Sequence, residues 1–398
     1  MKSIPLKYQL YIFYAALSCT AMATSIHDST FNNFLSDTFH LSADARGYLE
    51  FPRELPGFLV VMMTGLLCML PLTRVGLVGT LLSATGLSFL ALKGTGYPFM
   101  ILSMVSMSAG VHLLQPVSSS IVIGLSEAHN RGTRLGQAAA VSTTFTALGT
   151  GMVWFFMDRS APQYSTTFFC AAAVFLCGGI IYSLMHIPHL HQPRQRLVFR
   201  PQYRLYYLLE FLSGARKQIF LTFGPWVLIK VYGLPAASIA GLLMLSCLIG
   251  IVFKPLAGMT MDFMGERFVM IGEGLVLIFV CLGYGYAPKL IPDPTWARRL
   301  ACSCFILDEM LFALGNARAL YLSRLVPNLQ ELNSSLAMGI SINHVASMVI
   351  PAIAGTIWVG LGYERLFLGA ALFAVCLAIV ASRVPPSGNR TPKAAQAL

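Results

Sequence analysis

Long apolar runs follow one another along almost the whole chain, and each is close to the length of a membrane-spanning helix. A transmembrane helix needs about 20 predominantly apolar residues, and by this measure the sequence contains about twelve spans. The spans cover residues 8–33, 45–71, 74–92, 97–124, 134–157, 164–187, 205–231, 235–261, 268–287, 297–323, 333–359 and 362–382. The pattern predicts an all-α membrane protein.

One polar stretch near the middle of the chain is longer than the other connections. Residues 189–204 contain two prolines and four arginines. We therefore expect four parts: an N-terminal six-helix half at 1–188, a cytoplasmic linker at 189–204, a C-terminal six-helix half at 205–383 and a cytoplasmic tail at 384–398. Two repeated halves of transmembrane helices are typical of secondary transporters.

Composition narrows the class further. The 398 residues are 56% hydrophobic and only 11% charged, whereas soluble domains carry about 25% charged residues. A soluble enzyme is therefore excluded. The net charge of +11 comes from lysines and arginines that are most frequent in the loops on one side of the predicted spans, which favours a membrane protein over a nucleic-acid-binding protein. The positive-inside rule then places both termini in the cytoplasm, and we expect a monomer in a bacterial inner (plasma) membrane.

The sequence predicts no cofactor, no metal and no use of ATP. Most of the nine cysteines lie in apolar runs, where they are expected to serve as small packing residues. Cys302 and Cys304 lack the spacing of a metal site. A glycine-rich phosphate-binding loop of the Lys-Ser/Thr type is also missing from the sequence.

The connection between the eighth and ninth spans has a distinctive spacing. Gly258, Asp262, Gly265 and Arg267 follow the pattern G-x-x-x-D-x-x-G-x-R. A glycine lets two helices approach closely, and an acid and a base on either side of a tight turn can form a charged latch at the water interface. This spacing resembles the loop signature of the major facilitator superfamily of secondary transporters. The resemblance implies alternating access between two six-helix halves, with spans one, four, seven and ten lining a central path.

Other parts of the chain depart from the family pattern. The second copy of the latch, between spans two and three, keeps Arg74 but has Met69 and Leu72 where the family has Asp and Gly. Ser106 stands in span four where many members have an arginine tied to proton coupling, and span five lacks the Gly-Pro pair typical of the family's antiporters. Ser106 puts proton coupling by the family's common route in doubt, and the missing Gly-Pro pair weighs modestly against drug/proton antiport.

Charged residues within the apolar runs are the main candidates for function, because a charge at the bilayer centre costs about 2.5–3.5 kcal/mol on insertion scales. Span two contains Arg46, Glu50, Arg53 and Glu54, at spacings of three and four residues that place them on neighbouring parts of one helix face. Asp28 lies in span one. We consider two roles for these residues: an ion-pair network between helices, and a coupling or gating role.

A second group of charged residues lies in spans seven and ten. Arg216 and Lys217 fall near the middle of span seven, and Asp308 and Glu309 lie at a comparable depth in span ten. The cations either pair with these acids, as a lock between helices, or bind an anion, since a guanidinium can hold a carboxylate or phosphate through two hydrogen bonds. Arg318 lies closer to the inner end of span ten, where its long side chain is expected to extend to the interface.

Polar residues in the middle of two further spans complete the candidates. Span four contains His112 and Gln115, and span eleven contains Asn343 and His344. Histidine titrates near neutral pH, so either histidine could relay protons. The alternative is a histidine that is simply buried and hydrogen-bonded.

These residues predict a secondary transporter that moves a small organic anion or zwitterion together with a coupling ion, which we expect to be a proton. The predicted substrate-binding residues are Arg216, Lys217, His112, Gln115, Arg53 and Asn343. The predicted coupling or gating residues are Asp28, Glu50, Glu54, Asp308, Glu309 and His344. Two alternatives are efflux of drugs or lipophilic cations by proton antiport, and a sensor or accessory membrane protein without transport activity.

Overall fold

The computed structural model describes residues 6–386 apart from residues 68, 94–95, 128–129, 188–189 and 191–196. Throughout this described part the chain forms helices and no strand. Residues 189 and 191–196 of the predicted linker and most of the predicted tail lie outside it.

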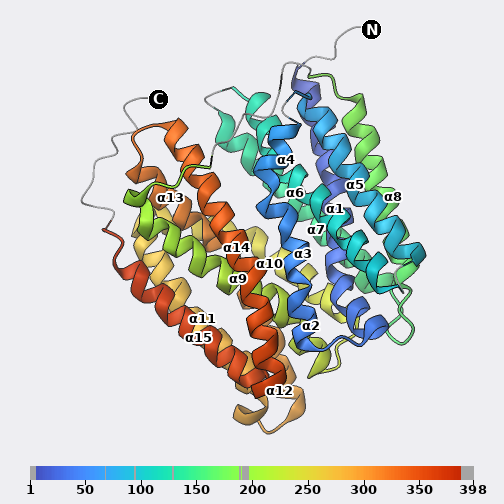
Figure 1. The fold of residues 1–398 in the computed structure, drawn as a ribbon, viewed down its shortest axis with the longest axis vertical. Helices are drawn as coiled ribbons and strands as arrows, with labels where there is room; N and C mark the ends of the chain where they lie inside the picture. Colours follow the sequence, from blue (N-terminus) through green and yellow to red (C-terminus); the bar gives the residue numbers. More distant parts are fainter. Residues whose placement is uncertain are drawn as a thin grey trace. The chain divides into compact units, whose positions relative to one another are not determined.

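The helices follow the predicted spans closely (Figure 1). In chain order they are α1 (Leu6–Phe39), α2 (Ala43–Tyr48), α3 (Glu50–Phe58), α4 (Val60–Leu66), α5 (Leu72–Lys93), α6 (Tyr97–Gly124), α7 (Arg131–Phe156), α8 (Tyr164–Leu184), the 3-10 helix η2 (Pro201–Tyr203), α9 (Arg204–Lys230), α10 (Ala236–Met264), α11 (Glu266–Leu290), α12 (Pro294–Leu311), the 3-10 helix η3 (Phe312–Gly315), α13 (Asn316–Leu325), α14 (Leu329–Leu361) and α15 (Tyr363–Ser382). Ten helical stretches among the described residues are long and apolar enough to cross a membrane. The broken second span and α9 complete the twelve-helix fold, which confirms the predicted fold class.

Two of the spans are interrupted, and each interruption lies beside charged residues. Span two consists of α2, α3 and α4, with breaks at Leu49 and Leu59. Pro52 and Pro56 each lack the backbone N–H that a helix needs, so the hydrogen-bond ladder is weakened around α3. Span ten changes from α12 to α13 through the four residues of η3. A short 3-10 stretch inside a helix often marks a hinge or strain.

The chain divides into two compact units, which are described separately. The first unit comprises Met1–His40, Leu55–Arg194 and Pro235–Cys247. In this unit α1 packs against α7 and α8, and α5 packs against α6 and α8. The backbones of α5 and α6 come very close at Gly110, where an added Cβ atom would lie 2.7 Å from the backbone nitrogen of Ser83.

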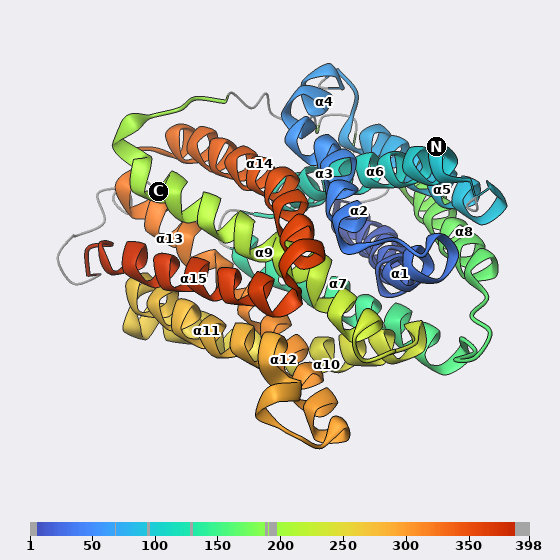
Figure 2. The ribbon, with the colours of Figure 1, turned by 60° about the horizontal axis from the view of Figure 1, so that its bottom comes forward.

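The second unit comprises Leu41–Glu54, Gln195–Leu234 and Leu248–Leu398. Here α9 packs along α14, α11 along α15, and α2 against α14 (Figure 2). Glycine makes two of these approaches close: a Cβ atom on Gly214 would lie 2.5 Å from the carbonyl oxygen of Asn343, and one on Gly47 would collide with the carbonyl of Pro351. The unit boundaries fall inside spans two and eight, so the predicted ranges of the two halves stay a prediction.

Candidate functional site

A buried carboxylate in span two connects this span to span seven within the second unit. The Glu50 side chain is fully buried, and its Oε1 accepts hydrogen bonds from Arg46 Nη1 at 2.5 Å and Arg53 Nη1 at 3.1 Å. Gln218 Nε2 of α9 donates to the other oxygen, Oε2, at 2.7 Å. Hydrogen bonds between ionised groups are roughly twice as strong as neutral ones. Glu50 therefore takes part in an ion-pair network, one of the two roles considered above, and its role in coupling or gating stays a prediction.

Arg216 of α9 is engaged by a carboxylate of span ten. Its Nη2 atom lies 2.6 Å from Asp308 Oδ1, and the two side chains are only 4% and 5% exposed. The guanidinium also lies over the Phe312 ring, with its carbon 4.7 Å from the ring centroid. Arg216 and Asp308 therefore form an ion pair between spans seven and ten, one of the two arrangements considered for them, and the substrate-binding role of Arg216 stays a prediction. Glu309, the next residue, is only partly buried.

Arg318 of α13 does not extend to the interface, so that expectation is wrong. Its side chain is 9% exposed and forms two ion pairs, with Glu210 of α9 (Nε to Oε1, 3.4 Å) and with Glu273 of α11 (Nη1 to Oε2, 3.5 Å). Asn343 Nδ2 of α14 donates a 3.4 Å hydrogen bond to Glu210 Oε2. Arg318 thus pairs with two carboxylates, and residues of α9, α11, α13 and α14 come together around it.

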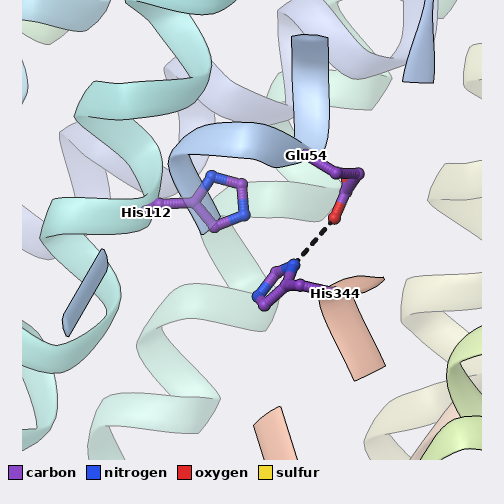
Figure 3. A group of neighbouring side chains, drawn as sticks. All are labelled: Glu54, His112 and His344. Carbon is purple, nitrogen blue, oxygen red and sulfur yellow. Dashed lines mark hydrogen bonds and ion pairs between the residues drawn. The ribbon is translucent and has the colours of Figure 1, made fainter. Parts of the chain in front are cut away.

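Glu54 and His344 form a buried acid–histidine pair (Figure 3). Glu54 Oε2 lies 2.9 Å from His344 Nδ1, and each side chain is 10% exposed. The residues are 290 positions apart in the chain, on α3 and α14. The sequence predicts a role in coupling or gating for both, and this role stays a prediction. A carboxylate and an imidazole at this distance can share a proton, since histidine titrates near neutral pH.

Lys217 differs from Arg46, Arg53, Arg216 and Arg318 of the second unit, which are ion-paired. It follows Arg216 on α9, and consecutive helical residues point about 100° apart, so the two side chains point in different directions. Its side chain is half-buried. It makes no hydrogen bond or ion pair with any residue in the part of the chain that the structure describes, and the carboxylates that act on it electrostatically are Glu54 and Glu210.

Three candidates lie in the first unit. Asp28 is hydrogen-bonded to the neighbouring His27 at 2.9 Å, and its side chain is 46% exposed. His112 Nδ1 lies 2.9 Å from the carbonyl oxygen of Ser108 on its own helix, α6. Gln115 is exposed. Their predicted roles in substrate binding and coupling stay predictions.

The loop motif forms the tight turn that its spacing suggested. Gly265 has a φ of 82° and is the single residue between α10 and α11, a conformation that favours glycine. Gly258 has open space around its Cα, and Asp262 is exposed. Neither Asp262 nor Arg267 forms an ion pair with the described residues. The ion pair at this turn instead joins the buried Glu266 to Arg324 at 2.8 Å, and the latch role of the motif stays a prediction.

The helices and buried charges are those of a membrane transporter, and comparison with known proteins places the chain in a family. The model of the Major Facilitator Superfamily matches residues 13–317. The chain therefore belongs to the major facilitator superfamily. It is a multi-pass integral membrane transporter and not an enzyme. No curated protein matches the sequence.

Solved structures share the fold at low sequence identity. The nucleoside transporter NupG is 16% identical, with a TM-score of 0.74 over 95% of this chain and 98% of that one. A D-xylose-proton symporter is 15% identical, with a TM-score of 0.75 over 96% and 99% of the two chains. A POT family transporter in complex with a thioalcohol-conjugated peptide is 12% identical, with a TM-score of 0.75 over 93% and 94%. Identities this low show the fold alone.

Proposed function

We propose that this protein moves a small organic anion or zwitterion across the membrane by alternating access, coupled to protons. The observation that carries the proposal is the state of Lys217. Four other cations within the spans of the second unit are each ion-paired to a carboxylate; these are Arg46, Arg53, Arg216 and Arg318. Lys217 has no such partner among the described residues. An anionic group of the substrate would complete its interactions in an environment where an unpaired charge is costly.

The coupling proton is assigned to Glu54 and His344. This pair is buried, it lies in the same unit as Lys217, and Lys217 acts electrostatically on the Glu54 carboxylate. A change in the charge near Lys217 is therefore felt by the group that binds the proton. Arg216, the first choice for substrate binding from sequence, is assigned to the lock with Asp308.

A neutral polar solute is the second candidate substrate. Arg46, Arg53, Arg216 and Arg318 are already neutralised by carboxylates, which leaves few of the buried charges for a strongly anionic ligand. Two proteins of the same fold are named as a nucleoside transporter and a D-xylose-proton symporter. Efflux of lipophilic cations ranks behind both, because Lys217 repels a cation.

The proposal also includes the oligomeric state, the membrane, the orientation and the two halves of the protein. We propose a monomer in the bacterial inner membrane with both termini in the cytoplasm. The distribution of lysine and arginine between the loops supports this orientation. The two six-helix halves are assigned to residues 1–188 and 205–383, joined by the linker at 189–204.

Thermal stabilisation of the purified protein tests the substrate class, because a ligand that binds only the folded state raises the melting temperature. The panel contains lactate and succinate as anions, alanine as a zwitterion, uridine and xylose as neutral solutes, and tetraphenylphosphonium as a lipophilic cation. Stabilisation by an anion or zwitterion that disappears in Lys217→Met and persists in Lys217→Arg supports the proposal.

Lys289→Met is the matched control, because Lys289 is an exposed lysine that pairs with Glu364 at 3.3 Å. This variant should respond to the panel as the wild type does. Stabilisation only by uridine or xylose favours the neutral solute. Stabilisation only by tetraphenylphosphonium favours efflux.

A further inference from the structure

Three exposed arginines lie at the end of the second unit where α11 leads into α12 and where α15 begins. Arg298 and Arg299 lie in the second turn of α12, and Arg365 lies in the first turn of α15. None of them forms an ion pair with any residue that the structure describes. The helix ends are close together, because α11 packs against both α12 and α15 (Figure 2). We call these three arginines the basic end.

The acidic residues that adjoin the basic end in the chain have other partners. Glu364 pairs with Lys289 of α11 at 3.3 Å, which also joins the end of α11 to the start of α15. Asp293 caps α12, since its carboxylate accepts hydrogen bonds from the backbone N–H groups of Thr295 at 2.8 Å and Trp296 at 3.0 Å. The basic end therefore keeps its positive charge and can attract an anion.

An exposed tryptophan accompanies the arginines. The Trp296 side chain is 58% exposed, and the guanidinium carbon of Arg299 lies 4.5 Å from the centroid of its ring. Tryptophan is enriched at the level of the lipid headgroups. In the proposed orientation this end of the unit lies on the outer side of the membrane, where the positive-inside rule makes lysine and arginine sparse. A specific anion would account for the concentration of arginine here.

An apolar stripe runs along each of two neighbouring helices towards the basic end. The stripe of α11 contains Leu275, Phe279 and Leu290, which are exposed and lie on one face. Phe279 and Leu290 are separated by about 16 Å along the helix, close to the roughly 15 Å of hydrocarbon in one leaflet. The stripe of α15 consists of Leu368, Leu372, Val375 and Ile379, also exposed.

Arg365 continues the stripe of α15. It precedes Leu368 by three residues, a spacing that keeps both side chains on the same face of the helix. The apolar surface therefore leads directly to one of the three arginines. A molecule that covers the stripes with hydrocarbon and ends in an anionic group matches both parts of this surface.

We propose that the basic end binds the headgroup of an anionic phospholipid, whose acyl chains lie along the stripes of α11 and α15. A guanidinium can hold a phosphate through two parallel hydrogen bonds. Phosphatidylglycerol carries a net negative charge, whereas the phosphate of phosphatidylcholine is balanced by its own ammonium, so the basic end selects the former. This site uses neither Lys217 nor the buried ion pairs, and it therefore goes beyond the proposed transport function.

Fluorescence quenching by brominated lipids tests the site in the intact protein. The protein is reconstituted into phosphatidylcholine vesicles that contain either brominated phosphatidylglycerol or, at the same mole fraction, brominated phosphatidylcholine. The contribution of Trp296 is the difference between each protein and the same protein with Trp296→Phe. We expect brominated phosphatidylglycerol to quench Trp296 more strongly in the wild type. Equal quenching by the two lipids overturns the proposal.

Two pairs of substitutions locate the preference. Each basic residue near an anionic membrane surface strengthens binding by a factor of about five. Arg298→Gln with Arg299→Gln should therefore reduce the preference for phosphatidylglycerol by about 5- to 25-fold. The matched control, Lys93→Gln with Arg159→Gln, removes two exposed charges from the predicted outer side of the first unit and should keep the preference. Equal preferences in the two double variants contradict a site at the basic end.

Inorganic phosphate distinguishes a lipid headgroup from a soluble anion. Addition of phosphate to the vesicles should leave the quenching of Trp296 by brominated phosphatidylglycerol unchanged, because the acyl chains keep the lipid at the site. Recovery of fluorescence on addition of phosphate, but not of the same concentration of chloride, would show that the basic end takes a soluble anion, and this result also overturns the proposal.

Discussion

Replacement of Arg216 should destabilise the protein strongly, because the side chain neutralises a carboxylate that has no access to water. Asp308 lies 2.6 Å from the guanidinium, and both side chains are almost fully buried. Removal of one partner of a buried ion pair costs about 3–5 kcal/mol. The contact of the guanidinium with the Phe312 ring, at 4.7 Å, contributes up to about 2 kcal/mol in a desolvated position. We therefore expect Arg216→Met to lower the free energy of unfolding by at least about 3 kcal/mol.

A double-mutant cycle isolates the ion pair from the other contacts of these residues. Arg216→Met combined with Asp308→Leu removes both charges and keeps similar volumes, and such replacements are often neutral or stabilising by about 1–4 kcal/mol. The double variant should thus recover most of the stability that Arg216→Met loses. Urea titration of each purified variant in detergent measures its free energy of unfolding.

Arg299→Met is the matched control for this cycle. Arg299 lies over the Trp296 ring at 4.5 Å, but its side chain is exposed, so its loss should cost no more than about 1 kcal/mol. The reasoning is refuted if Arg216→Met is no less stable than this control. It is also refuted if the double variant is as unstable as the single one, because the cost would then arise from contacts other than the pair.

The same variants separate the two roles considered for Arg216. If the arginine only locks spans seven and ten together, the double variant with Asp308→Leu should fold and transport. If Arg216 binds the substrate, transport should be lost in Arg216→Ala and in the double variant alike, while both insert into the membrane. A labelled-substrate uptake assay on the two variants gives the answer.

Two further predictions concern packing and the region before α9. Gly47→Val should destabilise the protein by about 1–3 kcal/mol, because its side chain would collide with the carbonyl of Pro351; Gly360→Ala, which has open space, should have little effect on the melting temperature. The pKa of Tyr203 is raised by burial and by the 2.6 Å hydrogen bond that it donates to Glu331. In Glu331→Gln this pKa should therefore fall, and tyrosinate absorbance should appear at a lower pH; an unchanged titration would exclude the bond.

The sequence was sufficient to predict the helices, because the length of an apolar run is set by the thickness of the bilayer. It also placed Arg46, Glu50 and Arg53 in reach of one another, since their contacts are made within a helical turn or so. The four-residue spacing of Arg46 and Glu50 is enough for a contact on any helix.

Contacts between distant spans could not be predicted in the same way. Glu54 and His344 are 290 residues apart, and their pairing depends on how α3 and α14 are packed and rotated. Among the described residues, Arg216 forms an ion pair and Lys217 does not. This difference likewise depends on the rotation of α9, since the two side chains point about 100° apart. Glu273 was missed, although an acid within an apolar span was itself a signal that a buried partner exists.

Uptake driven by a pH gradient tests the central claim most directly. The protein is reconstituted into liposomes, and the probe is the anion or zwitterion of the panel that raises the melting temperature most. The wild type should accumulate this compound when a pH gradient is imposed. Glu54→Gln and His344→Gln should exchange it across the membrane but fail to concentrate it. Equal accumulation without a pH gradient, or undiminished accumulation in both variants, would contradict proton coupling through this pair.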